Sequence, residues 1–152
     1  LSEKFIVQLS VVYRYILEQQ DYAWVDLEAE LAFLEAYFFL LQIRFGRKIQ
    51  LRQQVAPDQL VRKMPPFTLQ LLVENAVKHN KMSVAEPLVI RLCGEGDKLV
   101  VENNLNPRTQ PAESTGIGLD NIRKRYAFAT GQPVTVRRTD RLFAVTLPLL
   151  TP

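Results

Sequence analysis

The sequence has few of the residues that cross-link a chain or bend it sharply: one cysteine, one histidine and six glycines among 152 residues. The lone cysteine, Cys93, excludes an internal disulfide, and its place in an alternating apolar stretch predicts a buried side chain. A chain of this length can build one ordinary domain core without a disulfide or a structural metal.

Long apolar runs and strong charge are missing as well. No apolar stretch reaches the ~18–20 residues that a membrane-spanning helix needs, and the first residues lack the pattern of a signal peptide. The formal net charge is only +3, and no basic strip alternates with aromatic residues. These absences argue against nucleic-acid binding and favour a soluble piece in the cytoplasm.

The sequence does contain a helical segment with one polar face, over residues 69–80. At about 100° per residue, its apolar side chains fall on the side that would face a sheet. They are Leu69, Leu72, Val73, Ala76 and Val77. Glu74, Asn75 and Lys78 fall on the other side, with His79 at its edge. These groups could supply a base, a Mg²⁺ ligand and a phosphate counter-charge, or simply form a solvated face with a Glu74–Lys78 pair.

A second motif, residues 114–121, combines two of the six glycines with the start of a basic helix. Gly116 and Gly118 flank Ile117, and Asn121 follows three residues later. Glycines let a backbone approach an anion closely, and the N–H groups at a helix start bind phosphate. A lone Gly-x-Gly is usually an ordinary loop-to-helix junction, so this motif gains its weight from its pairing with the first.

Together the two motifs resemble the ATP-binding domain of the GHKL superfamily, which includes gyrase, Hsp90, histidine kinases and MutL. Residues 65–79 resemble the N-box of that family, and residues 116–125 resemble its second glycine box. Upstream, residues 9–15 and 37–45 resemble the helices that precede this domain in LytS-type sensor histidine kinases. The resemblance spans nearly the whole chain.

The resemblance implies that the chain binds ATP with Mg²⁺ and that Asn75 is the protein ligand of the metal. It implies that Glu74 is the catalytic base or polarising residue, and that Lys78 and His79 meet the phosphates. The second glycine box would supply Gly116, Ile117, Gly118, Leu119 and Asn121 to the nucleotide site. The family reaction transfers the γ-phosphoryl group of ATP to a histidine on a separate helix, which requires mainly positioning and charge neutralisation.

Two departures from the family pattern concern the adenine and the phosphoacceptor. The first glycine box of the family usually reads Asp-x-Gly-x-Gly, and its Asp accepts a hydrogen bond from the adenine amino group. Here Asn103 stands at the Asp position and Leu105 at the first glycine. The only histidine, His79, matches an ATP-site position. We therefore expect the phosphoacceptor outside these residues and no autophosphorylation of the chain.

Hydrophobic spacing predicts two helices ahead of the ATP-binding part. Residues 2–20 repeat Phe5, Leu9, Val12 and Ile16 at intervals of four, three and four, and Asp26 would cap a helix over residues 27–45. The second helix continues this seam with Leu27, Leu31, Leu34, Phe38, Leu41 and Phe45. The two helices either pack on each other and on the sheet, or form an arm that pairs with a second copy.

The remaining pattern is that of strands and one long loop. Residues 48–55 predict a strand, residues 88–93 and 99–101 a hairpin, and residues 134–136 and 143–147 a closing hairpin. Pro65 and Pro66 would open the N-box helix, and the polar residues 106–115 would form a lid over the nucleotide or a plain surface connection. The predicted class is α+β, a GHKL/Bergerat-type α/β sandwich whose mixed sheet is covered by helices on one face.

We interpret residues 1–46 as a helical arm from a dimerisation region and residues 47–152 as the catalytic ATP-binding domain of a two-component sensor histidine kinase. The expected partners are a second copy, through the N-terminal helices, and a response regulator; the full-length protein would be anchored in a membrane. One alternative is a degenerate nucleotide site that serves signalling and dimerisation, which Asn103 and Leu105 favour. The other is a GHKL ATPase with Glu74 as general base, whose longer lid and transducer domain do not fit this length.

Overall fold

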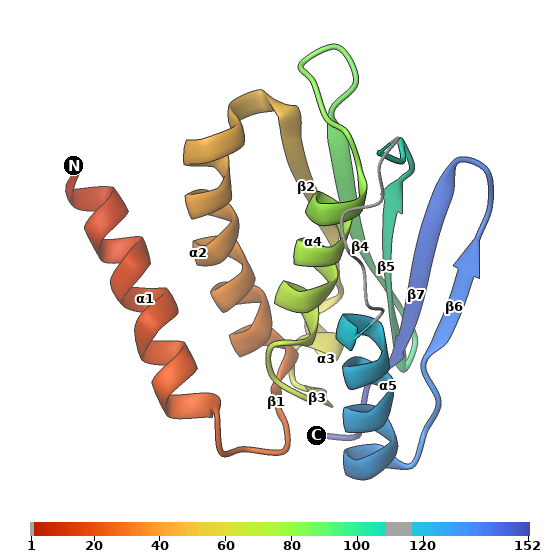
Figure 1. The fold of residues 1–152 in the computed structure, drawn as a ribbon. Helices are drawn as coiled ribbons and strands as arrows, with labels where there is room; N and C mark the ends of the chain where they lie inside the picture. The colour runs from red at the N-terminus through yellow and green to blue at the C-terminus, as the bar shows by residue number, and fades with distance from the viewer. Residues whose placement is uncertain (1, 109–116) are drawn as a thin grey trace.

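A five-stranded mixed sheet organises the molecule. In this computed structural model, which describes residues 2–108 and 117–152, the strand order is β2–β4–β5–β7–β6. Strands β2 (Ile49–Gln54) and β4 (Leu88–Glu95) run parallel, whereas β5 (Lys98–Asn104), β7 (Leu142–Pro148) and β6 (Thr135–Arg138) pair antiparallel. Helices α2 (Leu27–Phe45), α4 (Thr68–His79) and α5 (Ile117–Thr130) cover one face of the sheet (Figure 1). The predicted fold class is confirmed.

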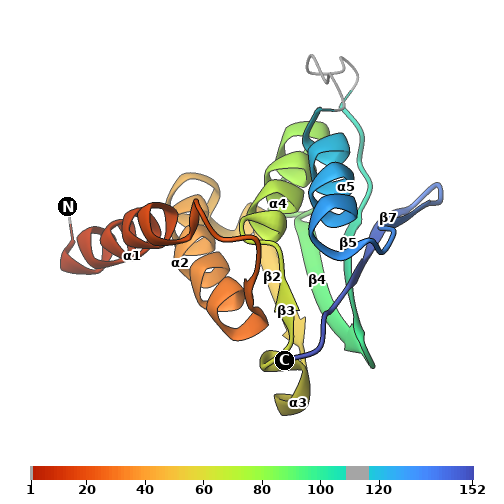
Figure 2. The same ribbon diagram turned by 90° about the horizontal axis from the view of Figure 1, so that it is seen from below.

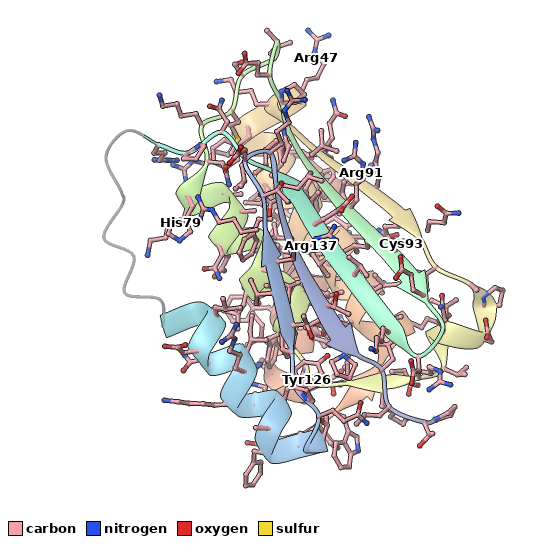
Figure 3. All side chains as sticks on the ribbon, turned by 90° about the vertical axis from the view of Figure 1, so that its right-hand side faces the viewer. Arg47, His79, Arg91, Cys93, Tyr126 and Arg137 are labelled. Carbon is pink, nitrogen blue, oxygen red and sulfur yellow. The ribbon has the colours of Figure 1, made fainter. Side chains whose placement is uncertain are left out.

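Alternation along the strands separates a helix-covered face from an open face. In β5, Leu99, Val101 and Asn103 are buried and face the helices, and Val101 lies opposite Leu92 of β4 and Val145 of β7. The intervening residues point to the open face, which carries Arg91, Cys93 and Arg137 (Figure 3). Cys93 is half-buried there, so the prediction of a buried cysteine is only partly met.

Helix α2 is apolar on two sides because it is packed on two sides. Leu27, Leu31, Leu34 and Phe38 join the main core against the sheet and α4. Its opposite side, with Phe33 and Ala36, packs on α1 (Glu3–Gln19), which lies outermost (Figure 2). The alternative in which the two helices pack on each other and on the sheet is therefore confirmed, while pairing with a second copy stays a prediction.

The predicted seam on α1 is partly wrong. Val12 is buried and Ile16 packs beside it, but Leu9 is 40% exposed. Tyr15 takes part instead, because its ring stacks on Phe33 of α2 with centroids 4.3 Å apart. This aromatic contact turns the buried side of α1 away from Leu9.

Several short elements were not predicted. Residues 46–48 form a 3₁₀ turn, η1 (Gly46–Lys48), and Pro57 begins a single helical turn, α3 (Pro57–Leu60). Strands β1 (Val25–Asp26) and β3 (Lys63–Met64) form a two-residue antiparallel ladder. Asp26 stands at the N-cap of α2 as predicted, but its carboxylate pairs with Lys63 instead of the helix backbone.

The side chain of Gln59 in α3 packs directly over β4. A Cβ on Gly94 would lie 1.9 Å from Gln59 Oε1, so only glycine leaves room for the Gln59 side chain in its observed position. The Gln59 amide spans two hydrogen bonds: Oε1 accepts from the Ala56 N–H at 2.8 Å, and Nε2 donates to the Gly96 carbonyl at 3.1 Å. The turn α3 is thereby attached to the β4–β5 hairpin.

The prolines do not open the N-box helix as predicted. Helix α4 begins at Thr68, and its N-cap is Phe67, whose φ of 68° is left-handed. A left-handed residue directly before the helix redirects the chain, so Pro65 and Pro66 precede the first turn instead of forming it.

Within the described residues, no helix is both long and apolar enough to cross a membrane.

Candidate nucleotide site

The two sequence motifs meet where α4 packs on α5. Gly118, in the first turn of α5, lies so close to α4 that a Cβ there would stand 3.0 Å from Asn75 Oδ1 and 3.1 Å from Asn75 Nδ2. Such a separation leaves almost no room for a side chain, so glycine at position 118 permits this approach. The fold thus brings the candidate metal ligand of the N-box to the start of the candidate phosphate-binding helix.

Helix α4 presents the apolar and polar faces that its periodicity predicts. Leu69, Leu72, Val73 and Ala76 are buried beneath it. Glu74 and Lys78 are exposed, and Asn75 and His79 are half-buried.

Glu74 is directed toward α2, away from the Asn75–Gly118 contact. Tyr37 Oη of α2 donates a hydrogen bond to Glu74 Oε1 at 3.2 Å, and Gln70 Nε2 donates to the same oxygen at 3.0 Å. Burial and then the Glu74 charge raise the pKa of Tyr37, so this phenol remains a donor. Glu74 and Asn75 therefore occupy adjacent sides of the helix, about 100° apart, rather than one shared point.

The C-terminal end of α4 is strongly positive. Burial lowers the pKa of His79, and the charges of Lys78, Arg138 and Arg108 lower it further. His79 lies at the end of α4 (Figure 3), and Arg138 reaches this region from β6, on the helix-covered face. A neutral imidazole among three cations makes a local field that attracts anions such as phosphate.

A buried asparagine joins this end of α4 to the chain that leaves β5. Asn80 is only 2% exposed; its Nδ2 donates to the Ala76 carbonyl at 2.9 Å, and its Oδ1 accepts from the Asn106 N–H at 2.8 Å. Arg108 then donates from Nη2 to the Val77 carbonyl at 3.3 Å. Sequence reasoning missed Asn80 and Arg108. Asn80 could have been identified from its position directly after the helix, where a side-chain amide can replace lost backbone partners.

Asn103 lies on the helix-covered face of β5 and is 6% exposed. Its Nδ2 donates to the Asn104 carbonyl at 2.9 Å. This bond directs the amide nitrogen to the backbone and leaves Oδ1 as the acceptor for any other group. An acceptor is what an adenine amino group requires.

The second glycine box is described only in part. Gly116 lies outside the described residues, and so does most of the predicted lid, residues 109–115. Ile117 begins α5, Leu119 packs against the main core, and Asn121 is exposed. The described part of this motif is therefore the first turn of a fourteen-residue helix, whose leading N–H groups have no intrahelical partner.

The side chains at this site suit a metal that arrives with its ligand. Among the described residues, no cluster of three or more His, Cys, Asp or Glu side chains could hold a metal ion. Mg²⁺ commonly keeps several waters and uses one or two protein oxygens together with substrate phosphates. A single amide oxygen from Asn75 beside a cationic helix end fits that manner of binding.

Comparison with known proteins identifies the family. A family model described as histidine kinase matches residues 1–49. Over 147 residues the chain is 31% identical to the sensor protein LytS of Bacillus subtilis (strain 168), and over 142 residues it is 39% identical to LytS of Streptococcus mutans serotype c. The chain belongs to the LytS-type sensor histidine kinases. The alignments cover 86% and 83% of the chain but 25% and 24% of the two LytS proteins, so the chain spans about a quarter of their length.

Solved structures share the fold of this LytS-type chain. The cytoplasmic segment of histidine kinase QseC aligns with a TM-score of 0.58 over 99% of this chain and 96% of that one. A nucleotide-free catalytic domain of histidine kinase ThkA aligns with a TM-score of 0.55 over 84% of this chain and 99% of that one. Both are 18% identical, a level at which the likeness concerns the fold alone. The fold is that of histidine kinase catalytic domains.

Proposed function

We propose that the chain binds Mg-ATP between α4 and α5 and presents its γ-phosphoryl group to a histidine outside residues 1–152. The observation that carries this proposal is the contact of Gly118 with Asn75, because it joins a phosphate-cradling helix start to a hard oxygen ligand. The cationic end of α4 adds charge neutralisation at the same site. In this proposal residues 47–152 are the catalytic domain and residues 1–46 its helical arm.

Each proposed role follows from a position. Asn75 would hold Mg²⁺, and Lys78 and His79 would contact the phosphates with Arg108 and Arg138 behind them. The backbone at Ile117, Gly118 and Leu119 would bind phosphate oxygens, with Asn121 at the entrance and Gly116 before it. The nucleotide and its metal supply the transferable group and most of its charge neutralisation.

Glu74 has a narrower role than the sequence implies. Its carboxylate already accepts two hydrogen bonds, from Tyr37 and Gln70. We propose that it polarises the nucleophile only when the acceptor helix displaces the Tyr37 contact. Hydrolysis of ATP with Glu74 as general base is less favoured than phosphoryl transfer, because the carboxylate already accepts these two hydrogen bonds.

A degenerate nucleotide site is the second candidate, and Asn103 is the observation that favours it. A neutral amide accepts a weaker hydrogen bond from adenine than a carboxylate does. Titration of ATP into the purified chain, with and without Mg²⁺, separates the two functions. Catalytic binding predicts saturable affinity that Mg²⁺ increases and that Asn75→Ala weakens at least about tenfold. Absence of Mg²⁺-dependent binding by the wild type would favour the degenerate site.

The same material tests the phosphoryl-transfer part of the proposal. Incubation with γ-labelled ATP should leave no acid-labile label on the chain, because the acceptor histidine lies elsewhere. Label on His79 would contradict its placement among phosphate-binding residues.

We also propose that the arm contacts a second copy through the side of α1 that its own chain leaves open. Ile6 is 53%, Tyr13 64% and Leu17 62% exposed, and the three lie on one side of the helix. Sedimentation should show a concentration-dependent dimer that Tyr13→Glu with Leu17→Glu abolishes. Val12 is unsuitable for this test because it packs inside the chain. A strict monomer at high concentration would contradict the proposal.

A further inference from the structure

A buried carboxylate of α2 holds the start of α4. Glu30 is 0% exposed, and its Oε2 and Oε1 accept hydrogen bonds from the N–H groups of Phe67 and Leu69, both at 3.2 Å. N–H groups at a helix start have no intrahelical partner, so acceptors from elsewhere in the chain satisfy them. Glu30 thus caps α4 from a different helix, 37 residues earlier in the chain than Phe67.

The arm helix α1 contacts the same carboxylate. Tyr15 Oη donates a hydrogen bond to Glu30 Oε2 at 2.5 Å. The Tyr15 ring also stacks on Phe33, and the Phe67 ring meets both rings edge-on, at 5.6 and 5.9 Å between centroids. Tyr15 of α1 therefore contacts both Glu30, whose carboxyl group caps α4, and Phe67, the residue directly before α4.

The residue between these contacts is strained. Phe67 has φ 68° and ψ 2°, a left-handed conformation that bulky side chains rarely adopt. Such a residue keeps its conformation only where its surroundings fix it. Here the fixing groups are the Glu30 carboxyl group and the Phe33 ring, both from α2, and the Tyr15 ring, from α1.

Helix α5 holds the neighbouring residue. Arg125 Nη1 donates to the Pro66 carbonyl at 2.6 Å. The adjacent Tyr126 is fully buried, and its hydroxyl is a buried group without a hydrogen-bond partner in the described part of the chain. Side chains from α1, α2 and α5 therefore contact the junction at Pro66 and Phe67. Helices α4 and α5 are also the two helices that line the candidate nucleotide site.

We infer that Tyr15 and Glu30 are positioning residues for the nucleotide site, through which the placement of the arm helix sets the start of α4 and hence the position of Asn75. Asn75 lies six residues beyond Leu69, about 9 Å along the same helix. Loss of the Tyr15–Glu30 bond removes one of the groups that fix Phe67, and the first turn of α4 then loosens. The inference rests on the proposed function, since it concerns the same site.

Three Tyr→Phe variants of the purified chain test this inference. Tyr15→Phe removes the hydroxyl bonded to Glu30; Tyr22→Phe removes the hydroxyl of an exposed side chain just after α1, and Tyr126→Phe removes the buried hydroxyl of α5. Hydrogen exchange at the Phe67 and Leu69 amides is measured alongside the Kd for Mg-ATP. We expect Tyr15→Phe to speed exchange of these two amides about tenfold and to raise the Kd for Mg-ATP severalfold, with neither effect in Tyr22→Phe or Tyr126→Phe.

A second variant is included because the loss of a single hydrogen bond can change the exchange rates too little to measure. Glu30→Gln keeps the side-chain length but replaces one acceptor oxygen by an amide donor, which opposes a backbone N–H. It should speed exchange of the same two amides more than Tyr15→Phe does.

Several results would overturn the inference. Unchanged exchange at Phe67 and Leu69 in both variants would show that the contacts do not hold α4, and a uniform rise across the chain would show global destabilisation only. Local loosening with unchanged Mg-ATP affinity would show that the junction does not position the site. If the wild type itself fails to bind Mg-ATP, the proposed function fails; exchange at the two amides then still decides whether Tyr15 couples α1 to α4.

Discussion

Helix α4 has an interior end and a surface end, and both are capped by side chains from other parts of the chain. At the N-terminal end, the carboxylate of Glu30 accepts from backbone N–H groups in a fully buried setting. At the C-terminal end, Arg108 donates to backbone carbonyls beside exposed Lys78 and half-buried His79. Each cap supplies the kind of group that its end of the helix lacks, an acceptor for the N–H groups and a donor for the carbonyls.

The difference between the ends lies in what remains available. At the buried end, both carboxyl oxygens of Glu30 are paired with groups of the protein, which suits a fixed support. The open end keeps cations in contact with solvent, which suits a charged ligand. The predictions below test whether support and ligand binding are separated along this helix in that way.

The largest expected effect contrasts two neighbouring positions in the middle of α4. Leu72→Ala should lower the free energy of unfolding by ~2–5 kcal/mol, because it removes methyl groups from a buried site. Asn75→Ala should change the free energy of unfolding little but raise the Kd for Mg-ATP, because Asn75 is half-buried beside Gly118 rather than in the core. Thermal unfolding and nucleotide titration of both variants supply the comparison. If Asn75→Ala mainly unfolds the chain, its role is structural.

A smaller effect is expected when the cap at the open end is removed. Arg108→Ala should lower stability by about 1 kcal/mol, because its contacts with the carbonyls of Val77 and Asn80 are at the surface. It should also raise the Kd for inorganic triphosphate, which serves as a probe of phosphate binding without adenine. Arg137→Ala, on the open face of the sheet, is the matched control and should change neither quantity (Figure 3). Equal losses of triphosphate affinity in both variants would indicate a general charge effect.

The adenine end of the site is tested by Asn103→Asp. A charged acceptor should strengthen the hydrogen bond from the adenine amino group by about 1 kcal/mol, or five- to tenfold in Kd. The substitution also removes the bond from Asn103 Nδ2 to the Asn104 carbonyl, but that loss affects every nucleotide alike. The quantity to measure is therefore the ratio of the Kd values for ATP and inosine triphosphate. An unchanged ratio would mean that adenine does not reach Asn103, as in a degenerate site.

The smallest expected effect is electrostatic and concerns His79. Its pKa should lie below 6.5, because burial and three neighbouring cations disfavour the charged imidazole. The folded chain then binds fewer protons than the unfolded chain between that pKa and 6.5. Its free energy of unfolding should accordingly fall as the pH decreases through this window.

NMR titration of the imidazole measures this pKa directly. Bound triphosphate should raise it, and so should Arg138→Gln, whereas Arg137→Gln on the opposite face of the same strand should leave it unchanged. A pKa that triphosphate does not move would place the anion away from His79.

Much of the architecture could be predicted because it depends on local pattern. The helix over residues 27–45 and both hairpins follow from hydrophobic spacing and turn residues, which act within a few positions of the chain. That residues 75 and 118 lie close together was expected only from the resemblance of their two motifs to the GHKL ATP-binding domain. Periodicity alone does not specify which helices become neighbours.

The support of α4 could not be predicted, because it depends on contacts between distant residues. Glu30 is one of two acidic residues in the first turn of α2 and has the sequence appearance of a solvated residue, yet it is among the most buried side chains. Nothing in the sequence around Phe67 indicates a left-handed residue, since its conformation is imposed by groups from α1 and α2. For the same reason Leu9 was assigned to the buried side of α1 in place of Tyr15, which turns inward to reach Glu30.

The packing of Gln59 over Gly94 limits how this sequence can change over evolution. A methyl group at position 94 would occupy the space of the Gln59 amide, so alanine there requires the Gln59 side chain to move or a smaller residue at position 59. Either change gives up the bonds to Ala56 and Gly96 that attach α3 to the hairpin. Among relatives that keep glutamine at position 59, glycine at position 94 should therefore be retained.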